Sequence, residues 1–599
     1  MAHASKQTSK TKAVSLNEEE IGIAEIVAVA RNRASVEPFQ GPKRNHAEAV
    51  RKYVEQHWLS DSSPALYGFN TGIGSLKNVK IPQGQIQEFQ RYYVKSHCVG
   101  VGEPLDIEIV RAAMLIQANA LSKGYSGVRP LIVDKLIEML NKGIHPVVPE
   151  QGSLGASGDL APMTHITSVL VGEEEAEVWI AGERCRIAQI KDSNNFLQVR
   201  RKGEEVTFQP IQLHGKEAVS LTNSTAVMLA ISVLLLHDAE ILLKNADIAA
   251  ALSLEAMMCE KDAFVQELHA LRGQKGQMLT AHNIRRLIEG SQRMTPEARH
   301  AYFNEWISSL LNRNLKASSD KEAVKKYKME FEFDRNRIQD AYSLRCVPQV
   351  HGACKDTFHH VKTIVTREIS AVTDNPVIFP RRGEASDYDV RSGGNFHGEP
   401  LALVLDFLAI ALAEIGSISE RRTFRLLSPH MSFGLPQNLT GGEAGMNSGY
   451  MLLQYTGAQL VSENKILAHP ASVDSVPTSD NQEDHVSMGM TAARKARKIL
   501  HNVQNLLAIE FLCAVQGIHL SSQNEAVSLP KFSLGRETSK AFDFITCFQV
   551  KKDGAAVFPF QKMHGDEYAN TKIRMMNELS RSGKIVDAIG TDCVLVEPS

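Results

Sequence analysis

The chain has 599 residues, of which 43% are hydrophobic and 22% are charged, as is usual for a globular protein. Lysine and arginine together number 66 against 68 aspartates and glutamates, which gives a formal net charge of -2. This balance argues against a broad basic surface for nucleic acid or a membrane, so we expect the partner to be a small molecule or another copy of the chain.

The N-terminus carries three lysines within its first fifteen residues and no apolar run, so we expect residues 1–17 to form a disordered tail rather than a secretory signal. The longest apolar stretch, residues 401–413, is interrupted by Asp406 and falls short of the roughly 18 residues that a membrane span needs. Eight cysteines show no C-x-x-C pair and no zinc-like spacing, which predicts reduced thiols in a cytoplasmic protein.

Helical periodicity dominates from residue 18 onward. Apolar residues recur at three- and four-residue intervals over residues 107–140, with a break at residues 124–130. Further long helices are expected, several of them apolar on more than one face, which is typical of helices inside a bundle. They cover residues 217–244, 401–427, 449–468 and 487–516.

Two short β-like stretches, residues 176–199 and 205–209, are too few to organise a sheet. The polar residues 312–340 predict a mobile or weakly helical excursion. We therefore predict an all-α fold, a central bundle of long helices with a loop-rich N-terminal region. The expected divisions are a tail (1–17), an N-terminal domain (18–215), the long-helix bundle (216–530) and a C-terminal helical region (531–599).

The most informative string is G-S-L-G-A-S-G-D-L-A-P, from Gly152 to Pro162. A hydrolase G-x-S-x-G elbow would need glycine at position 159, where the chain has Asp159, and no Gly-Lys-Ser/Thr follows as in a phosphate loop. Read alone, Ala-Ser-Gly is no more than a tight turn before a helix, with Asp159 or Ser157 as the cap.

The whole string resembles the signature of the aromatic amino acid ammonia-lyases and 2,3-aminomutases. In that family the Ala-Ser-Gly backbone cyclises and loses two waters to give 4-methylidene-imidazol-5-one (MIO), an electrophile that acts as the cofactor. The resemblance implies that Ala156, Ser157 and Gly158 form this group, with no external cofactor and no metal. It also implies the helical fold that ammonia-lyases share with fumarases, and a homotetramer.

The residue types suit such a ring closure. Gly158 offers an unhindered amide nitrogen, Ala156 adds little bulk, and Ser157 has a hydroxyl to eliminate.

The segment Tyr67 to Gly74 resembles the family's Y-G-x-x-T-G-x-G loop, whose tyrosine is the general base. A tyrosine has a reference pKa of about 10 and is a poor base at neutral pH. The role of Tyr67 therefore requires hydrogen bonds or helix N-termini that favour the phenolate.

Further segments imply substrate contacts. Tyr342-Ser343-Leu344-Arg345 resembles the family's Y-S-L-R, in which the arginine holds the substrate carboxylate by two parallel hydrogen bonds and the tyrosine lines the pocket. Asn223 falls in the family's N-G-T and would contact the carboxylate. Here Ser224 replaces the glycine, which leaves open whether the backbone beside the electrophile is altered.

Two later segments complete the resemblance, which covers roughly residues 60–525. Gly393-Gly394-Asn395-Phe396 resembles G-G-N-F, with Phe396 packed near the electrophile, and Asn481-Gln482-Glu483-Asp484 resembles the N-Q-E/D segment, with Gln482 at the substrate.

Two positions bear on the substrate ring. His97 stands where the family selects the ring, and histidine there suits a tyrosine hydroxyl or an imidazole. Glu399 stands where phenylalanine and tyrosine enzymes often have glutamine and histidine ammonia-lyases have glutamate. A buried carboxylate suits an imidazole N–H, whereas facing a phenyl ring it would be unpaired at a cost of several kcal/mol. The other reading of Glu399 is a helix-start residue before Pro400.

These features predict a histidine ammonia-lyase, in which Tyr67 removes a β-proton, Arg345 fixes the carboxylate, and urocanate and ammonia leave. A phenylalanine or tyrosine ammonia-lyase and a 2,3-aminomutase remain open. Residues 277–342 form a longer segment than expected of a histidine enzyme, and Gln437-Asn438 replaces an apolar pair. An inactive helical scaffold is a fourth possibility, and a metal hydrolase is disfavoured because no H-E-x-x-H occurs.

Overall fold

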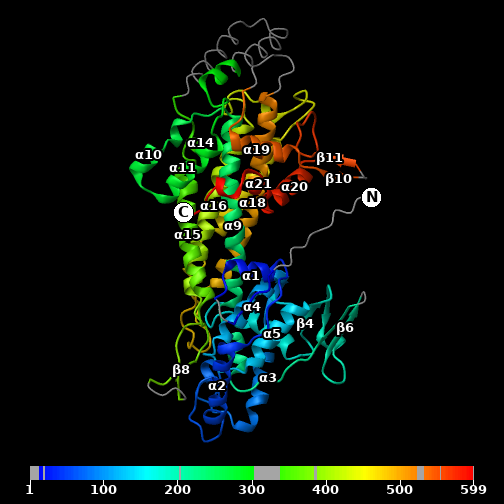
Figure 1. Ribbon diagram of the computed structural model, residues 1–599, viewed down its shortest axis with the longest axis vertical. Coiled ribbons are helices and arrows are strands. Elements are labelled where there is room, and N and C mark those ends of the chain that lie inside the picture. Colours follow the sequence, from blue (N-terminus) through cyan, green and yellow to red (C-terminus); the bar gives the residue numbers. More distant parts are fainter. Residues whose placement is uncertain are drawn as a thin grey trace. The chain divides into compact units, whose positions relative to one another are not determined.

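A computed structural model describes residues 12–17, 20–201, 204–302, 338–382, 387–522, 532–552 and 555–597 (Figure 1). Helices dominate this part of the chain, and its strands form only small antiparallel sheets of two or three strands. The predicted all-α fold is confirmed. The chain divides into two compact units, and each is made of separate segments, whereas the predicted domains are continuous. Unit 1 comprises Met1–His237, Val361–Asp406 and Pro470–Lys495, and unit 2 comprises Asp238–His360, Phe407–His469 and Ala496–Ser599.

Unit 1 holds the shorter N-terminal helices and most of the strands. Its helices are α1 (Ile23–Ala30), α2 (Gly41–His57), α3 (Ile86–His97), α4 (Ile107–Ser122), α5 (Pro130–Lys142), α6 (Leu160–Leu170), α7 (Ile187–Ile190) and α8 (Glu217–Thr222). Its sheets pair β1 (Val101–Pro104) with β3 (Pro149–Gln151), β2 (His145–Pro146) with β4 (Glu177–Ile180) and β5 (Glu183–Arg186), β6 (Leu197–Arg201) with β7 (Glu204–Phe208), and β8 (Val377–Pro380) with β9 (Tyr388–Arg391).

Unit 2 is mainly helical. It contains α10 (Gln266–Arg272), α11 (Lys275–Leu287), α14 (Tyr342–Arg345), α17 (Met451–Leu467), α19 (Arg536–Thr546), α20 (Ala569–Arg581), α21 (Lys584–Ile589) and the strand pair β10 (Val550–Lys552) and β11 (Ala555–Val557). Four long helices contribute residues to both units: α9 (Ala226–Ala256), α15 (Val347–Ile369), α16 (Glu399–Leu426) and α18 (Gly489–Ser522).

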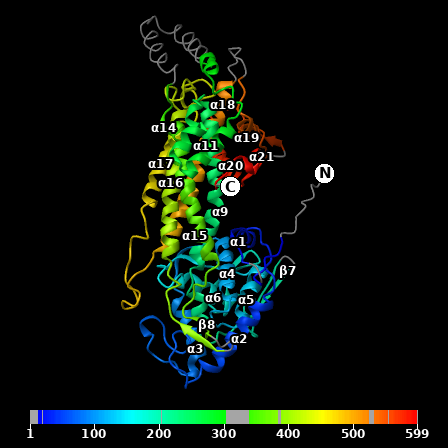
Figure 2. The same ribbon diagram turned by 60° about the vertical axis from the view of Figure 1, so that its left-hand side comes forward.

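The long helices pack against one another through buried polar contacts as well as apolar ones. In unit 2, Glu510 of α18 accepts hydrogen bonds from Arg422 of α16 (2.6 Å to Nε) and from Ser253 of α9 (2.7 Å), and all three side chains are buried. The three helices run side by side in both views (Figures 1 and 2). Together with the buried apolar side chains that all three helices carry, these contacts confirm the predicted helix bundle.

Local signals explain where several helices begin and end. The predicted break at residues 124–130 separates α4 from α5, which starts at Pro130 and ends before Gly143, a left-handed residue with φ +69°. Proline is common at the first position of a helix, and glycine is common just after its last residue. The predicted helix over residues 217–244 is wrong in one respect, because α8 ends at Thr222 and α9 begins only at Ala226.

Three helical stretches are long and apolar enough to cross a membrane by length and composition, which corrects the expectation that none would be. They are Glu217–Ala256, Glu399–Leu426 and Gly489–Ser522, and 78%, 67% and 89% of their most apolar windows are buried inside the molecule. Most of their apolar surface is thus already covered by the protein itself.

Two predicted irregular segments lie wholly or largely beyond the described residues. The first eleven residues of the predicted tail do so, whereas residues 12–17 pack: the Val14 N–H donates to the Ser35 carbonyl (2.8 Å) and Leu16 is buried. The predicted excursion at residues 312–340 also lies outside, apart from its last three residues.

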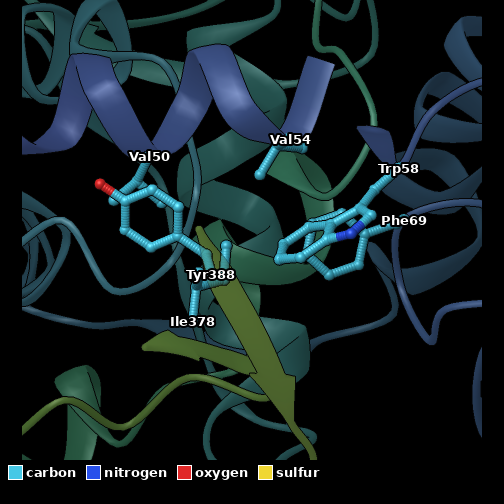
Figure 3. Packing of buried hydrophobic residues seen from close by; sticks show 6 residues of the cluster. All are labelled: Val50, Val54, Trp58, Phe69, Ile378 and Tyr388. Carbon is cyan, nitrogen blue, oxygen red and sulfur yellow. The ribbon is translucent and has the colours of Figure 1, made fainter. Parts of the chain in front are cut away.

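A compact apolar cluster in unit 1 anchors the loop that follows Tyr67. Val50 and Val54 of α2, Trp58, Phe69, Ile378 of β8 and Tyr388 of β9 pack together, as Figure 3 shows. Phe69 lies edge-on to Trp58, with ring centroids 5.4 Å apart, and it is only 1% exposed. Because Phe69 is two residues from Tyr67, its burial holds the tyrosine loop against α2 and the β8–β9 hairpin.

Candidate functional site

The turn from Gly152 to Asp159 brings Ser157 to a carboxylate that is distant in sequence. The Ser157 hydroxyl donates to Glu483 Oε1 at 3.0 Å, and the hydroxyl of Thr478 donates to Glu483 Oε2 at 2.8 Å. The sequence motif Asn481-Gln482-Glu483-Asp484 contains this carboxylate, but the motif alone does not indicate its contact with Ser157. Its position beside Gln482 was the signal that could have found it.

Asp159 fixes the end of this turn to the start of α9. Its Oδ2 accepts the N–H groups of Val227 (3.0 Å) and Met228 (2.8 Å), and its Oδ1 accepts the Ser153 hydroxyl (3.0 Å). Burial raises the pKa of Asp159 to about 6, although these hydrogen bonds oppose the shift. The sequence suggested that Asp159 caps the helix that follows it, but its side chain instead caps α9.

Gly158 lies against the backbone of the segment between α8 and α9. Its φ is +65°, and a Cβ placed on it would lie 2.3 Å from the carbonyl oxygen of Ser224. The N–H of Asp159 donates to that same carbonyl at 2.7 Å. Both the backbone angle and the available space therefore require glycine at this position.

The Ser224 side chain is accommodated without backbone strain. Ser224 is not among the non-glycine residues with positive φ, and its hydroxyl accepts hydrogen bonds from the Ala226 N–H (3.2 Å) and the Thr373 hydroxyl (3.3 Å). The replacement of the family's glycine therefore adds polar contacts at the start of α9, and a left-handed residue is not needed there.

Asn223 holds the backbone of the middle residue of the Ala-Ser-Gly segment. With its amide oriented to satisfy both groups, its nitrogen donates to the Ser157 carbonyl (3.1 Å) and its oxygen accepts from the Asn375 N–H (3.1 Å). Asn223 is 5% exposed and directly follows α8. It thus contacts the predicted electrophile segment, and its predicted contact with the substrate carboxylate stays a prediction.

Tyr67 is half-buried, and its hydroxyl accepts a hydrogen bond from the Gly74 N–H at 3.3 Å. Burial raises the pKa of Tyr67, the hydrogen bond from Gly74 lowers it, and the nearby charge of Glu483 raises it. The pKa of Tyr67 is therefore raised overall. Among the described residues, the Gly74 N–H is the one hydrogen-bond donor to the Tyr67 hydroxyl, and surroundings that favour the phenolate stay a prediction.

His97 ends α3 with its ring stacked on Tyr93 (centroids 3.9 Å apart) and its Nδ1 at 2.9 Å from the Tyr93 carbonyl. A carbonyl can only accept, so Nδ1 carries the proton and Nε2 is left as an acceptor in the neutral ring. Burial lowers the pKa of His97, which favours this neutral form.

The segment that precedes α16 lies against the Ala-Ser-Gly turn, because the Gly398 N–H donates to the Gly155 carbonyl at 3.1 Å. Phe396 in this segment is half-buried. Glu399 is the first residue of α16, and its N–H donates to His397 Nδ1 at 3.3 Å. Its Oε2 is buried and has no hydrogen-bond partner among the described residues.

Three further predicted residues have partners outside the Ala-Ser-Gly segment. Gln482 is exposed, and its Oε1 accepts a hydrogen bond from Lys77 Nζ. Tyr342 and Arg345 belong to unit 2, where the Arg345 guanidinium lies 4.6 Å from the Tyr342 ring centroid and its Nε donates to the Asp340 carbonyl at 2.8 Å. Their place at the site stays a prediction. In the described part of the chain, no group of three or more His, Cys, Asp or Glu residues could hold a metal ion.

Comparison with known proteins gives a consistent result. Residues 21–545 match the family model described as aromatic amino acid lyase. A histidine ammonia-lyase of Alkaliphilus oremlandii is 41% identical over 581 residues, which cover 96% of this chain and 98% of that protein. The crystal structure of a tyrosine aminomutase from Streptomyces globisporus is similar with a TM-score of 0.79 and 31% identity, over 97% of this chain and 98% of the other. The structure of a histidine ammonia-lyase from Trypanosoma cruzi has a TM-score of 0.77 and 31% identity, over 97% and 96%.

Proposed function

Because the chain belongs to the aromatic amino acid lyase family, and is thus a carbon–nitrogen lyase, we propose that it eliminates ammonia from L-histidine and releases trans-urocanate. The histidine ammonia-lyases that it resembles at 40–45% identity support this substrate.

The observation that carries the choice of histidine is the unpaired carboxylate oxygen of Glu399. A buried acceptor that lacks a partner costs about 1–3 kcal/mol, and more when it is charged. In this structure Glu399 Oε2 is buried without a protein donor. An imidazole N–H of the substrate would satisfy it, whereas a phenyl ring has no donor to offer. His97, neutral and with Nε2 as acceptor, is a second group suited to a ring N–H.

We assign the electrophile to Ala156, Ser157 and Gly158, as implied by a family of MIO-dependent enzymes. Ring closure would join the Gly158 nitrogen to the Ala156 carbonyl carbon, and the two waters lost would carry the Ala156 carbonyl oxygen and the Ser157 hydroxyl. The residues fit this chemistry, since the Ser157 hydroxyl lies on the Glu483 carboxylate and the Ser157 carbonyl is held by Asn223. When formed, the group supplies an electron sink for the amine, which makes the nitrogen a better leaving group.

The chain's own residues would bind the substrate and move its proton. Tyr67 would take the β-proton and so must work as phenolate. Arg345 would hold the carboxylate by two hydrogen bonds. Asn223 uses one amide hydrogen on the Ser157 carbonyl and keeps a second for the carboxylate. Phe396 and Tyr342 would line the pocket and Gln482 would complete its polar side.

The principal alternative is a 2,3-aminomutase, favoured by the likeness to the Streptomyces enzyme. In such an enzyme ammonia would re-add at the β-carbon before the product leaves. Incubation with L-His, L-Tyr and L-Phe distinguishes the candidates, with each acrylate followed in the ultraviolet and β-amino acids followed by chromatography. Urocanate formed from L-His supports the proposal. Turnover of L-Tyr or L-Phe without turnover of L-His would contradict the proposed substrate but not the family.

We further propose a cytoplasmic homotetramer. All eight cysteines are free thiols, as expected in a reducing compartment. In unit 2, large apolar side chains are exposed on α16 and on α17, which packs beside it through Gly457 and Asn464. They are Phe407 (44% exposed), Ile410 (48%), Leu452 (62%), Tyr455 (65%) and Ile466 (74%). Such a surface suits burial against another copy of the chain.

A further inference from the structure

A buried ion pair lies in unit 1, in contact with segments that carry residues assigned to the site. Lys216 Nζ donates to Asp374 Oδ2 at 2.7 Å and to the Ser220 hydroxyl at 2.8 Å, and Ser220 in turn donates to Asp374 at 2.7 Å. Lys216 is 0% and Asp374 5% exposed. Neither residue belongs to the motifs that carry the family resemblance, and the proposed chemistry uses neither.

This ion pair is a costly arrangement for a purely structural role. Desolvating two charges offsets much of their attraction, so apolar residues of similar volume are often as stable. Lys216 also has φ +80°, in the left-handed region that a residue with a Cβ rarely adopts. Strain of this kind persists where the surrounding structure fixes the residue, and it concentrates at functional sites.

On one side, the Lys216 side chain contacts the loop that carries Tyr67. Its Nζ lies 5.9 Å from the centre of the Phe69 ring. Its Cδ would be 3.5 Å from a Cβ placed on Gly68, which adopts φ +77°. Lys216 therefore supports the two residues that directly follow Tyr67 in the chain.

On the other side, Asp374 reaches the Ala-Ser-Gly segment through two asparagines. Its Oδ1 accepts the Asn375 N–H at 2.6 Å, and the same N–H faces the Asn223 amide oxygen at 3.1 Å. The Asn223 nitrogen then donates to the Ser157 carbonyl at 3.1 Å. A continuous path of hydrogen bonds thus runs from the buried lysine to the backbone of the predicted electrophile.

We propose that the Lys216–Asp374 ion pair is a positioning element that sets the Tyr67 loop and the Ser157 segment relative to each other. Neither residue touches the reacting atoms. The role rests on the proposed function, because it matters only if Tyr67 and Ser157 act together. A misplacement of about 1 Å between reacting groups can lower a rate by roughly 100-fold.

The test compares two double variants. Lys216→Met/Asp374→Ala removes both charges and the acceptor for the Asn375 N–H, while avoiding an unpaired buried charge. Lys216→Met/Asp374→Asn also removes both charges but keeps an oxygen that can accept from Asn375. Folding is checked by circular dichroism and thermal unfolding, the intact mass gives the fraction of chains that have lost two waters, and kcat and KM are measured on L-His.

The control is the neighbouring ion pair between Glu217 of α8 and Arg129, whose side chain is 21% exposed. Glu217 is 0% exposed, and its carboxylate accepts from Arg129 Nε (2.7 Å) and Nη2 (2.6 Å) and from the His214 N–H (2.8 Å). Arg129→Met/Glu217→Ala therefore removes a second ion pair of unit 1, whose carboxylate is fully buried and lies one residue along the chain from Lys216.

We calculate kcat for the chains that have lost two waters, and we expect it to fall at least about tenfold further in Lys216→Met/Asp374→Ala than in the control. KM should change less than kcat. The variant with asparagine at position 374 should regain part of the lost kcat. A smaller difference overturns the inference. If the alanine variant does not fold, the asparagine variant must still show lower kcat than the control, and an equal kcat overturns it. Failure of the wild-type chain on L-His would instead overturn the proposed function, while the fraction of two-water-lighter chains would still test the link to Ser157.

Discussion

At the scale of single residues, we expect Glu399 to select the ring that the site accepts, because its Oε2 is buried without a partner among the described residues. The substitution Glu399→Gln keeps the shape of the side chain but removes the charge that an imidazole N–H would pair with. Hydrogen bonds to charged groups contribute about 1.5–3 kcal/mol, so kcat/KM on L-His should fall by roughly 10- to 100-fold. Any residual activity on L-Phe should change little, and equal losses on both substrates would show that Glu399 does not contact the ring.

Tyr67 should set the pH dependence of the reaction. Burial raises its pKa above the ordinary value of about 10, so the phenolate fraction grows with pH throughout the neutral and mildly alkaline range. We expect log(kcat/KM) to keep rising above pH 9. Tyr67→Phe should remove this rise together with about 10²- to 10⁴-fold of the rate, the usual contribution of a general base. A plateau already at neutral pH would contradict this assignment.

His97 should not contribute an acid-side loss of activity near its ordinary pKa. Burial lowers its pKa, so the neutral ring persists as the pH falls through that range.

Site residues that lie within a sequence motif could be predicted from the sequence. Contacts between residues that are far apart in the chain could not. Tyr67, Ser157, Asn223 and Glu399 each lie in a motif, and the structure places their segments in unit 1. The contact between Ser157 and Glu483 spans 326 residues and that between Lys216 and Asp374 spans 158. Neither hydrophobic periodicity nor the spacing of residues within a motif can predict a contact between residues so far apart in the chain.

At the scale of elements, the turn between β3 and α6 depends on the backbone of the break between α8 and α9. Gly158→Ala would place a methyl 2.3 Å from the Ser224 carbonyl oxygen and would strain a residue at φ +65°. We expect this variant to keep the uncyclised mass and to be inactive. Gly182→Ala is the control, because φ there is +82° and nothing lies within 4 Å of the added methyl. Normal cyclisation of Gly158→Ala would show that the close approach is unimportant.

Long helices were the most predictable elements, since their apolar pattern repeats over many turns. The predicted 401–427 and 449–468 correspond to α16 (Glu399–Leu426) and α17 (Met451–Leu467). The break after Thr222 falls on the polar run from Thr222 to Thr225, which the predicted helix over residues 217–244 includes without interruption. Long-range contacts hold the backbone there: Asn223 donates to the Ser157 carbonyl, and the Asp159 side chain caps α9.

At the scale of the whole molecule, the exposed apolar residues of unit 2 should be buried by assembly. Leu452→Lys/Tyr455→Lys places two charges on the exposed face of α17. We expect the wild-type chain to run as a tetramer in analytical ultracentrifugation and this variant to run as a smaller species with unchanged helical content. Replacing exposed charged residues of the same unit, as in Lys275→Gln/Lys584→Gln, should leave the assembly intact. A variant that remains tetrameric would place the interface elsewhere.

The intact mass of the purified chain is the decisive measurement, because the proposed reaction requires an electrophile made from Ala156, Ser157 and Gly158. We predict a mass two waters below that of the sequence, and a mass without this loss for Ser157→Ala, which has no hydroxyl to eliminate. A wild-type chain at the full mass of its sequence, or a Ser157→Ala chain that still turns over L-His, would contradict the account.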